Sequence, residues 1–169
     1  MPGRIEGDEM RALILSLMMS LVCGRAWATI SYVSYSETAP TNYNGTAIST
    51  QTTQALSTTT GNLIVVTING GWGNCNVSSV SDTASNTYHQ ATGACVSSAG
   101  VYEDIWYAYN ITGNTSNVVT VHYTNANGYT MVDQIQFSGA STSSDPFETA
   151  KNGTASGTSA TTASFSPAA

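Results

Sequence analysis

Apolar and polar residues alternate with a period of two along most of the chain, which is the spacing of a half-buried β-strand. Clusters of Gly, Asn, Asp and Ser separate these segments. No segment shows helical spacing with caps over a useful length. Many short strands at this spacing favour two antiparallel sheets packed face to face, an all-β sandwich of jelly-roll or immunoglobulin-like type. The predicted strands are 30–36, 47–56, 62–69, 77–81, 87–91, 101–111, 117–124, 129–138, 147–152 and 159–165.

Three turn segments between the expected strands contain Asn, Asp or Gly, residues that accept left-handed backbone conformations. They are residues 82–86, 113–114 and 125–128, and each predicts a hairpin between the strands that it joins. In strand 129–138, Asp133 shares a face with apolar residues such as Ile135. We therefore expect either a buried Asp133 with partners or a bulge that shifts the register.

The segment EDIWYAYNI, residues 103–111, is apolar on both faces of the strand that it predicts. Trp106 and Ala108 point to one side. The other side carries Ile105, Tyr107, Tyr109 and Ile111. One side packs into the core. The second side is therefore either covered by another part of the chain or open to a partner.

The first 28 residues have the layout of a secretory signal peptide. Arg11 precedes the apolar run ALILSLMMSLVCG, and Ala26 and Ala28 form the small-x-small cleavage pattern. We expect cleavage after Ala28 and a secreted or cell-surface product in which residues 29–169 form a single domain. The acidic stretch before Met10 is atypical of a signal peptide, which makes Met10 an alternative start.

An uncleaved membrane anchor is the rival interpretation of these 28 residues. The apolar run is shorter than the roughly 20 residues that span a bilayer, so no membrane insertion is expected after cleavage.

Charged residues make up only 8% of the chain, against roughly 25% in typical soluble domains. After residue 28, Lys151 is the only Lys or Arg. A chain with one basic residue cannot neutralise a phosphate backbone, which excludes nucleic acid and anionic membranes as partners. The seven acidic residues in this part are Glu37, Asp82, Glu103, Asp104, Asp133, Asp145 and Glu148.

Cys75 and Cys95 are the pair of cysteines that follows residue 28, and in an exported protein such a pair predicts one disulfide. Two reduced thiols are the alternative. The histidines His89 and His122 lack nearby ligand partners in the sequence, so no zinc site is expected.

A calcium site at residues 82–86 would need more oxygen ligands than this stretch offers, and an Asx-type turn is favoured there. We expect no metal and no cofactor.

Catalytic patterns are missing from the sequence as well. Glu103 and Asp104 are adjacent, so a strand sends them to opposite faces, where they cannot act together on a glycosidic bond. We expect both to be solvated at the edge of a turn. The sequence contains no G-x-S-x-G, and neither His89 nor His122 has an evident Ser or Cys partner. We therefore expect that the protein is not an enzyme.

The order of several motifs resembles a β-sandwich module of bacterial secreted and cell-surface, adhesin-like proteins. GNLIVVTI is followed by VSSVSDTASNTYHQA, DIWYAYNITG, NVVTVHY, and a strand ending in QFSG before DPFE. That family shows a GN-aliphatic strand, an SDxxGNTY hairpin, a WYAKN strand and an EYSG…DP corner in the same order. Two positions depart from it: Ser85 stands where the turn glycine is usual, and Tyr109 stands where Lys is common.

The resemblance implies a structural or binding module and supplies no catalytic residues. It also implies that Trp106 and Ala108 face the core and that the opposite side is an aromatic stripe. The last residues resemble the lead into a further GNLIVV-type strand, which leaves the sandwich without its closing strand. An unfinished sheet edge favours a homo-oligomer or polymer, such as an extracellular filament assembled by strand addition.

The donated strand in such a filament is expected to be residues 29–36 or 159–165. The alternative function is a carbohydrate-binding module that uses surface aromatics. The aromatics that could stack on sugar rings are Tyr32, Tyr35, Trp72, Tyr107 and Tyr109. The candidate interface or glycan-contact residues are Trp72, Ile105, Tyr107 and Tyr109.

Overall fold

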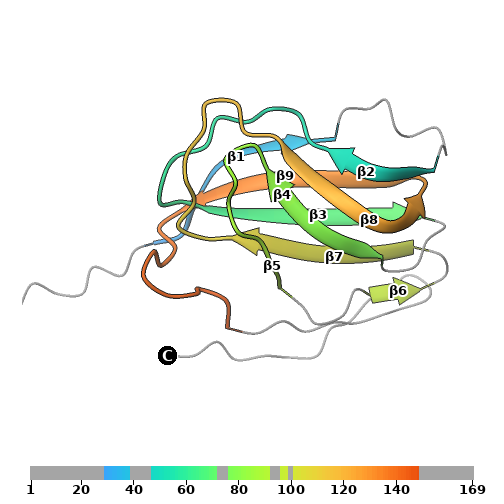
Figure 1. Ribbon diagram of the computed structural model, residues 1–169. Helices are drawn as coiled ribbons and strands as arrows, with labels where there is room; N and C mark the ends of the chain where they lie inside the picture. The colour runs from blue at the N-terminus through green and yellow to red at the C-terminus, as the bar shows by residue number, and fades with distance from the viewer. Residues whose placement is uncertain (1–28, 39–46, 72–75, 92–95, 99–100, 149–169) are drawn as a thin grey trace, which may run out of the picture.

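The computed structural model describes residues 29–38, 47–71, 76–91, 96–98 and 101–148. These residues form two antiparallel sheets packed as a sandwich (Figure 1), which confirms the predicted fold class. The expected signal peptide, Trp72, Cys75, Cys95 and the candidate strand 159–165 lie outside the described residues.

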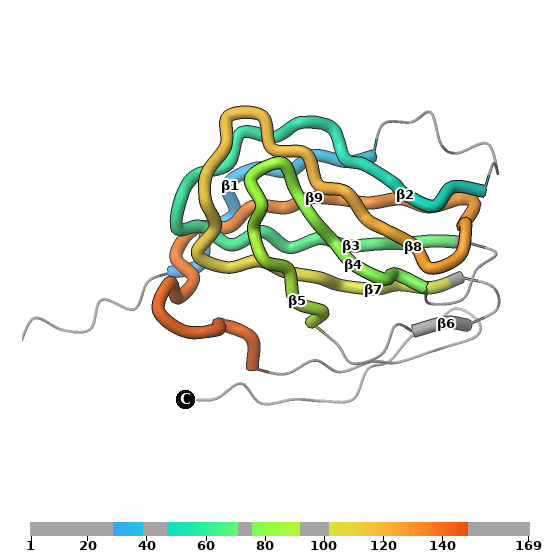
Figure 2. Tube along the Cα trace, viewed as in Figure 1, coloured from blue at the N-terminus to red at the C-terminus, as the bar shows by residue number. Residues whose placement is uncertain are grey.

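The large sheet has six strands. Five of them follow the order β1 (Ser31–Glu37), β9 (Thr130–Ser138), β3 (Leu63–Gly71), β7 (Val101–Ala108) and β5 (His89–Gln90), and β6 (Val96–Ser98) also pairs with β7. The small sheet has the order β2 (Ile48–Thr52), β8 (Val119–Asn127) and β4 (Val77–Asp82). In Figure 2 the trace crosses repeatedly from one sheet to the other.

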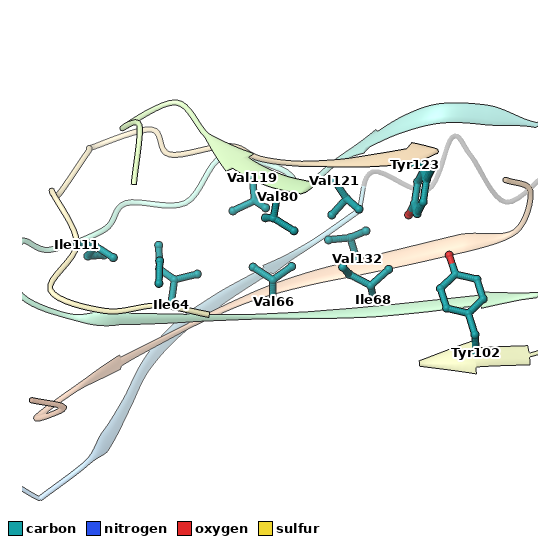
Figure 3. Packing of buried hydrophobic residues seen from close by; sticks show 11 residues of the cluster. Ile64, Val66, Ile68, Val80, Tyr102, Ile111, Val119, Val121, Tyr123 and Val132 are labelled. Carbon is teal, nitrogen blue, oxygen red and sulfur yellow. The ribbon is translucent and has the colours of Figure 1, made fainter. Parts of the chain in front are cut away.

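The core lies between the two sheets, where every second residue of the central strands points inward. β3 pairs with β9 on one side and with β7 on the other, so it is a central strand, as its apolar residues on both faces require. Figure 3 shows the inward side chains of the two sheets facing each other, with Tyr102 and Tyr123 at one end. The buried cluster comprises Ile64, Val66, Ile68, Val80, Tyr102, Ala108, Ile111, Val119, Val121, Tyr123 and Val132.

Beside this apolar core the interior is polar. Gln134 and Gln136 of β9 are buried with their neighbour Val132, and they find partners among loop and strand groups. Thr53 donates from Oγ1 to Oε1 of Gln134 at 3.2 Å. Oε1 of Gln136 accepts the backbone N–H of Thr59 at 2.7 Å, so residues around 59 cover the inner face of the large sheet here.

The expectation for Asp133 was wrong in both forms. The ladder between β3 and β9 runs without interruption, the register irregularity in the β1–β9 pair lies in β1 and not at Asp133, and Asp133 is half-exposed. The side of β9 that carries Met131, Asp133, Ile135 and Phe137 is the outer face of the sheet. Polar glutamines point inward instead, which is a pattern that simple alternation assigns to the wrong side.

The three expected hairpins were also wrong. Residues 82–86 join β4 in the small sheet to β5 in the large sheet, and these two strands do not pair. Residues 113–114 lie between β7 and β8, and residues 125–128 lie at the passage from β8 to β9, again between different sheets. Turn-forming residues lie near each of these connections, but they do not decide whether the flanking strands pair with each other.

Several strand limits differ from the prediction. The expected strand 47–56 is a strand only at Ile48–Thr52, followed by isolated bridges at Thr53 and Leu56. The short strand β6 was not expected, and the described residues 147–148 are not in a strand.

Candidate interaction site on the outer face of the large sheet

The outer face of the large sheet carries rows of apolar side chains that run across the strands. One row joins Tyr35 of β1, Ile135 of β9, Val65 of β3, Tyr107 of β7 and His89 of β5, which are register partners from strand to strand. A second, parallel row contains Tyr32, Phe137 and Leu63. We call this set of eight side chains the apolar outer face.

The part of the apolar outer face that lies over β1, β9 and β3 is open. Tyr32 and Tyr35 are 59% and 60% exposed, and the rings of Tyr32 and Phe137 meet edge to face at 6.4 Å. Val33 beside them and Met131 at the far end of β9 are also exposed. Exposed aromatic and aliphatic side chains that cluster on one sheet face are typical of interaction surfaces. This part is called the open half below.

Residues 139–148, which we call the strap, cover Tyr107 in the other part of the apolar outer face, while His89 of β5 stays exposed. In Figures 1 and 2 the strap is the orange-red segment that follows β9 and runs beside β7 and β5. The ring of Phe147 stacks on Tyr107 with centroids 5.5 Å apart, and the Tyr107 hydroxyl donates to both carboxylate oxygens of Asp145 at 3.0 and 2.8 Å. Tyr107 is consequently only 6% exposed, although it points away from the core.

The Tyr107–Asp145 contact changes the ionisation of both groups. Burial, followed by the hydrogen bond to Asp145, raises the pKa of Tyr107 to about 12. The backbone N–H of Phe147 donates to Asp145 at 2.9 Å, and this bond together with the Tyr107 hydroxyl lowers the pKa of Asp145 below its ordinary value of 3.8. At neutral pH the pair is therefore a neutral phenol bonded to a carboxylate.

Side chains hold the strap to the sheet. Among the described residues, no backbone–backbone hydrogen bond joins residues 140–147 to a strand. A stacked aromatic pair such as Phe147–Tyr107 contributes about 0.5–1.5 kcal/mol beyond its buried area, whereas ordering one residue costs about 1–2 kcal/mol. Asp145 is exposed, so water competes for its hydrogen bonds. The strap can therefore open locally without unfolding the sandwich.

Two contacts set where the strap starts. Gly139 has a φ of +85° and lies against the carbonyl oxygen of Thr29, so a side chain there would meet both strain and the backbone. Within the strap, the backbone N–H of Ser144 donates to Oγ of Ser141 at 3.2 Å. The strap thus leaves β9 through a tight, glycine-dependent turn.

Acidic side chains lie at one end of the outer face. Glu37 of β1 and Asp133 of β9 are register partners, and Thr67 of β3 donates to Asp133 at 3.1 Å. Like charges directly opposite each other on a sheet are destabilising. The described residues contain seven acids and no Lys or Arg, while the apolar rows themselves carry no carboxylate. The face therefore has an uncharged part and an acidic end.

The site residues expected from the sequence fall into three groups. Tyr107 and Tyr109 do point outward, and His89 lies against both rings, at 5.6 Å from Tyr107 and 6.0 Å from Tyr109. Ile105 is half-buried on the same face. Of the two alternatives for this side of the strand, covered or open to a partner, Tyr107 takes the first, because the DPFE motif folds back over it. Trp72 lies outside the described residues.

Sequence reasoning missed Tyr32 and Tyr35 as the most exposed members of this face. Both belong to the segment SYVSYSE, whose outward positions are aromatic. The signal was present, because Tyr32 and Tyr35 were recognised as aromatics that could stack on sugars. A register irregularity between Tyr32 and Ser34 places them on one face although they are three residues apart, and the sequence does not reveal that shift.

The adjacent acids of β7 separate as expected, with Glu103 exposed and Asp104 on the opposite side. The expectation that both are solvated was wrong for Asp104, which is 2% exposed. Its carboxylate accepts hydrogen bonds from the side chain of Gln90 and from the Trp106 ring nitrogen, the latter at 3.0 Å. These donors compensate for the burial of the charge.

A serine and a histidine that are far apart in the sequence meet on the outer face of the small sheet. Oγ of Ser81 lies 3.1 Å from Nε2 of His122, which sequence reasoning could not detect across 41 positions. Both side chains lie on the solvent side of adjacent strands, β4 and β8.

Asp82 organises the turn at residues 82–86. Its carboxylate accepts the backbone N–H groups of Ala84 and Asn86, the Asn86 side chain, the Tyr88 hydroxyl and the Asn117 side chain, at 2.8–3.1 Å. Burial beside Asp82 raises the pKa of Tyr88 well above its usual range. The carboxylate is the centre of an Asx-type turn, as its residue types predict.

Within the part of the chain that the structure describes, no group of three or more His, Cys, Asp and Glu side chains could hold a metal ion. A search of the same residues finds no helix with the length and apolar content needed to cross a bilayer.

Comparisons with known proteins do not assign the chain to a family. No protein-family model matches it, and neither a curated protein nor a solved structure is significantly similar to it.

Proposed function

We propose that the protein is a secreted structural or adhesive component whose copies associate through the open half of the apolar outer face. The observation that carries this proposal is the exposure of Tyr32 and Tyr35 on a face that continues into Ile135 and Val65. The expected signal peptide supports an extracellular location. A second copy is the partner of choice because the acidic end, with Glu37 and Asp133, can be kept outside a contact between two uncharged parts.

The size of the open half indicates a weak contact. Three strands about 4.8 Å apart, each with seven residues at about 3.3 Å, cover on the order of 300 Å². Two copies would bury about 600 Å² together, below the roughly 1,000 Å² expected of a stable interface. Such a contact suits a surface assembly in which many weak contacts act together.

Strand addition remains a candidate for extending such an assembly into a filament. Of the two expected donor segments, residues 31–36 are already paired with β9 inside the chain, and residues 159–165 lie outside the described residues. The edge strands β1, β2 and β4 each have a register irregularity against their neighbour, whereas the ladders on β3 have none. The edge strand β5 is regular but only two residues long. Irregular edges disfavour pairing with another chain, which is why face contact is preferred here.

Sedimentation equilibrium of residues 29–169, from micromolar concentration to about 1 mM, tests the association. We expect a reversible, concentration-dependent increase in mass that is weakened at least tenfold by the double substitution Tyr32→Ser, Tyr35→Ser. Losing two anchor side chains of an interface typically costs more than the 1.4 kcal/mol that corresponds to tenfold. Thr52→Ala, at an exposed position of the small sheet, is the matched control.

A monomer at every concentration would refute the proposal. Association that the Tyr32 and Tyr35 substitutions leave unchanged would move the contact to another surface. Thermal unfolding of each variant shows whether the fold itself is intact.

Carbohydrate binding is the second candidate, and the same two tyrosines favour it. Aromatic rings on a flat sheet face can stack on sugar rings, but Tyr107 is covered and cannot take part while the strap is closed. Retention on insoluble polysaccharides that is lost in the Tyr32→Ala, Tyr35→Ala variant would support this function. Retention that survives both changes would exclude these residues from it.

A further inference from the structure

We propose that the strap is an autoinhibitory segment, which occupies the end of the apolar outer face that a second copy would otherwise contact. This inference rests on the proposed function, because it concerns the regulation of the same surface. Its first support is continuity: the row from Tyr35 through Ile135 and Val65 to Tyr107 and His89 is unbroken beneath the strap.

The area of the face is the second support. With the strap lifted, Tyr107 joins the open half, so the face is four strands wide instead of three, and its area rises from on the order of 300 to about 440 Å². Two such faces bury about 900 Å², which is close to the roughly 1,000 Å² of a specific interface. Strap opening therefore enlarges the contact toward the size that a stable dimer needs.

The third support is the way in which the strap is held. Tyr107 donates its hydroxyl to Asp145 and stacks against Phe147, which is itself 39% exposed. These are side-chain contacts to a single sheet residue. An incoming copy can replace both of them, because its own aromatic side chains can stack on Tyr107 in place of Phe147.

Phe147 also has a second possible position in the assembly. A strap that lifts from its own sheet carries an exposed aromatic ring, and the open half of a neighbouring copy offers Tyr32, Tyr35 and Phe137 as a surface for it. The closed strap therefore competes with association. The open strap can instead strengthen association by placing Phe147 on the neighbouring copy.

The experiment measures strap opening and association separately in residues 29–169. Opening is measured by hydroxyl-radical labelling of Tyr107 in dilute, monomeric protein, and association by sedimentation equilibrium. The variants are Asp145→Asn, which weakens the acceptor for Tyr107, and Phe147→Ser, which removes the stacked ring. Glu103→Gln is the control for Asp145→Asn, since it removes the same charge from an exposed residue outside the strap.

We expect both strap variants to label Tyr107 several-fold more and to associate about tenfold more tightly than the wild type, while Glu103→Gln changes neither by more than about twofold. Increased labelling of Tyr107 with unchanged or weaker association would overturn the strap inference and leave the Tyr32 and Tyr35 contact standing. Unchanged labelling of Tyr107 in both variants would also overturn it. Monomers throughout, with Tyr107 exposed, would instead refute the proposed function.

Discussion

Among the residues that the structure describes, three other than glycine have positive φ angles, and each is at a turn between sheets. They are Ser85 at 59°, Asn110 at 48° and Tyr129 at 54°. Asn accepts this conformation because its short polar side chain can form hydrogen bonds with the nearby backbone, which offset the steric cost. The hydroxyl of Ser offsets less of that cost. The motif resemblance in the sequence implies glycine at the position of Ser85, and the positive φ there is a conformation that suits glycine. The conformation itself could not be predicted from a serine.

Ser85→Gly is therefore expected to stabilise the protein by about 0.5–1 kcal/mol. The left-handed conformation costs about 1–2 kcal/mol for a residue with a side chain, and the extra freedom of glycine in the unfolded chain offsets about 0.5–1 kcal/mol of that relief. The free energy of unfolding in urea measures the effect.

Asn110→Gly is the matched control for this prediction and should gain less, because Asn already tolerates its φ of 48°. A destabilised Ser85→Gly variant would mean that the hydroxyl of Ser85 contributes more than its backbone costs.

Burial at single positions was predicted unevenly. Val119, Val121 and Tyr123 point inward as their spacing indicates, because apolar alternation in β8 is unambiguous. In β9 the inward residues include two glutamines and the outward residues include Phe137, so hydrophobicity alone selects the wrong face. Loop and strand groups bond both ends of the Gln136 amide and the oxygen of the Gln134 amide, and these partners are a tertiary property that the sequence does not show.

The strap is the element that sequence reasoning could not foresee. The motif DPFE was noticed, and a strand was expected from Phe147 onward. Instead, the Asp145 carboxylate accepts the N–H of Phe147 and the hydroxyl of Tyr107, which ties a loop to an outer sheet face across 38 positions. Local propensity says nothing about such a distant partner. The double apolar character of EDIWYAYNI was the correct signal that something covers its second face.

Strap closure predicts an unusual ionisation of Tyr107. Because the folded pKa of about 12 is above the value near 10 of an unfolded tyrosine, the stability that this group contributes is complete below about pH 10 and is lost as the pH rises through 12. Ultraviolet titration of the wild type minus Tyr107→Phe isolates this step.

The Phe147→Ser variant should lower the midpoint of the Tyr107 titration step toward 10, because it uncovers the ring. A wild-type midpoint near 10 would contradict strap closure in solution. Asp145 acts at the other end of the pH scale. Its pKa is lowered in the folded state, so its contribution is present above about pH 4 and is lost as the pH falls below that value.

At the scale of the whole molecule, the fold class followed from strand number and spacing, and the two-sheet sandwich is confirmed. The connections did not follow, since the segments at 82–86, 113–114 and 125–128 pass between sheets. This topology gives the molecule two unlike sheets. The small sheet has a polar outer side with Ser81 and His122, while the large sheet has an outer side that is apolar in its centre and acidic at one end.

The association proposed here uses that asymmetry. A chain with seven acids and no Lys or Arg among its described residues repels its own copies wherever carboxylates face one another. The uncharged centre of the large sheet is where two copies can approach closely. The strap decides how much of that centre is available, so association and strap position are two parts of one equilibrium.

Radical labelling of Tyr32 and Tyr35 as a function of protein concentration tests this account most directly. Tyr129, which is 37% exposed at the turn before β9, is the internal reference. We predict that labelling of Tyr32 and Tyr35 falls as residues 29–169 associate, while labelling of Tyr129 stays constant. Association without protection of Tyr32 and Tyr35 would contradict the account.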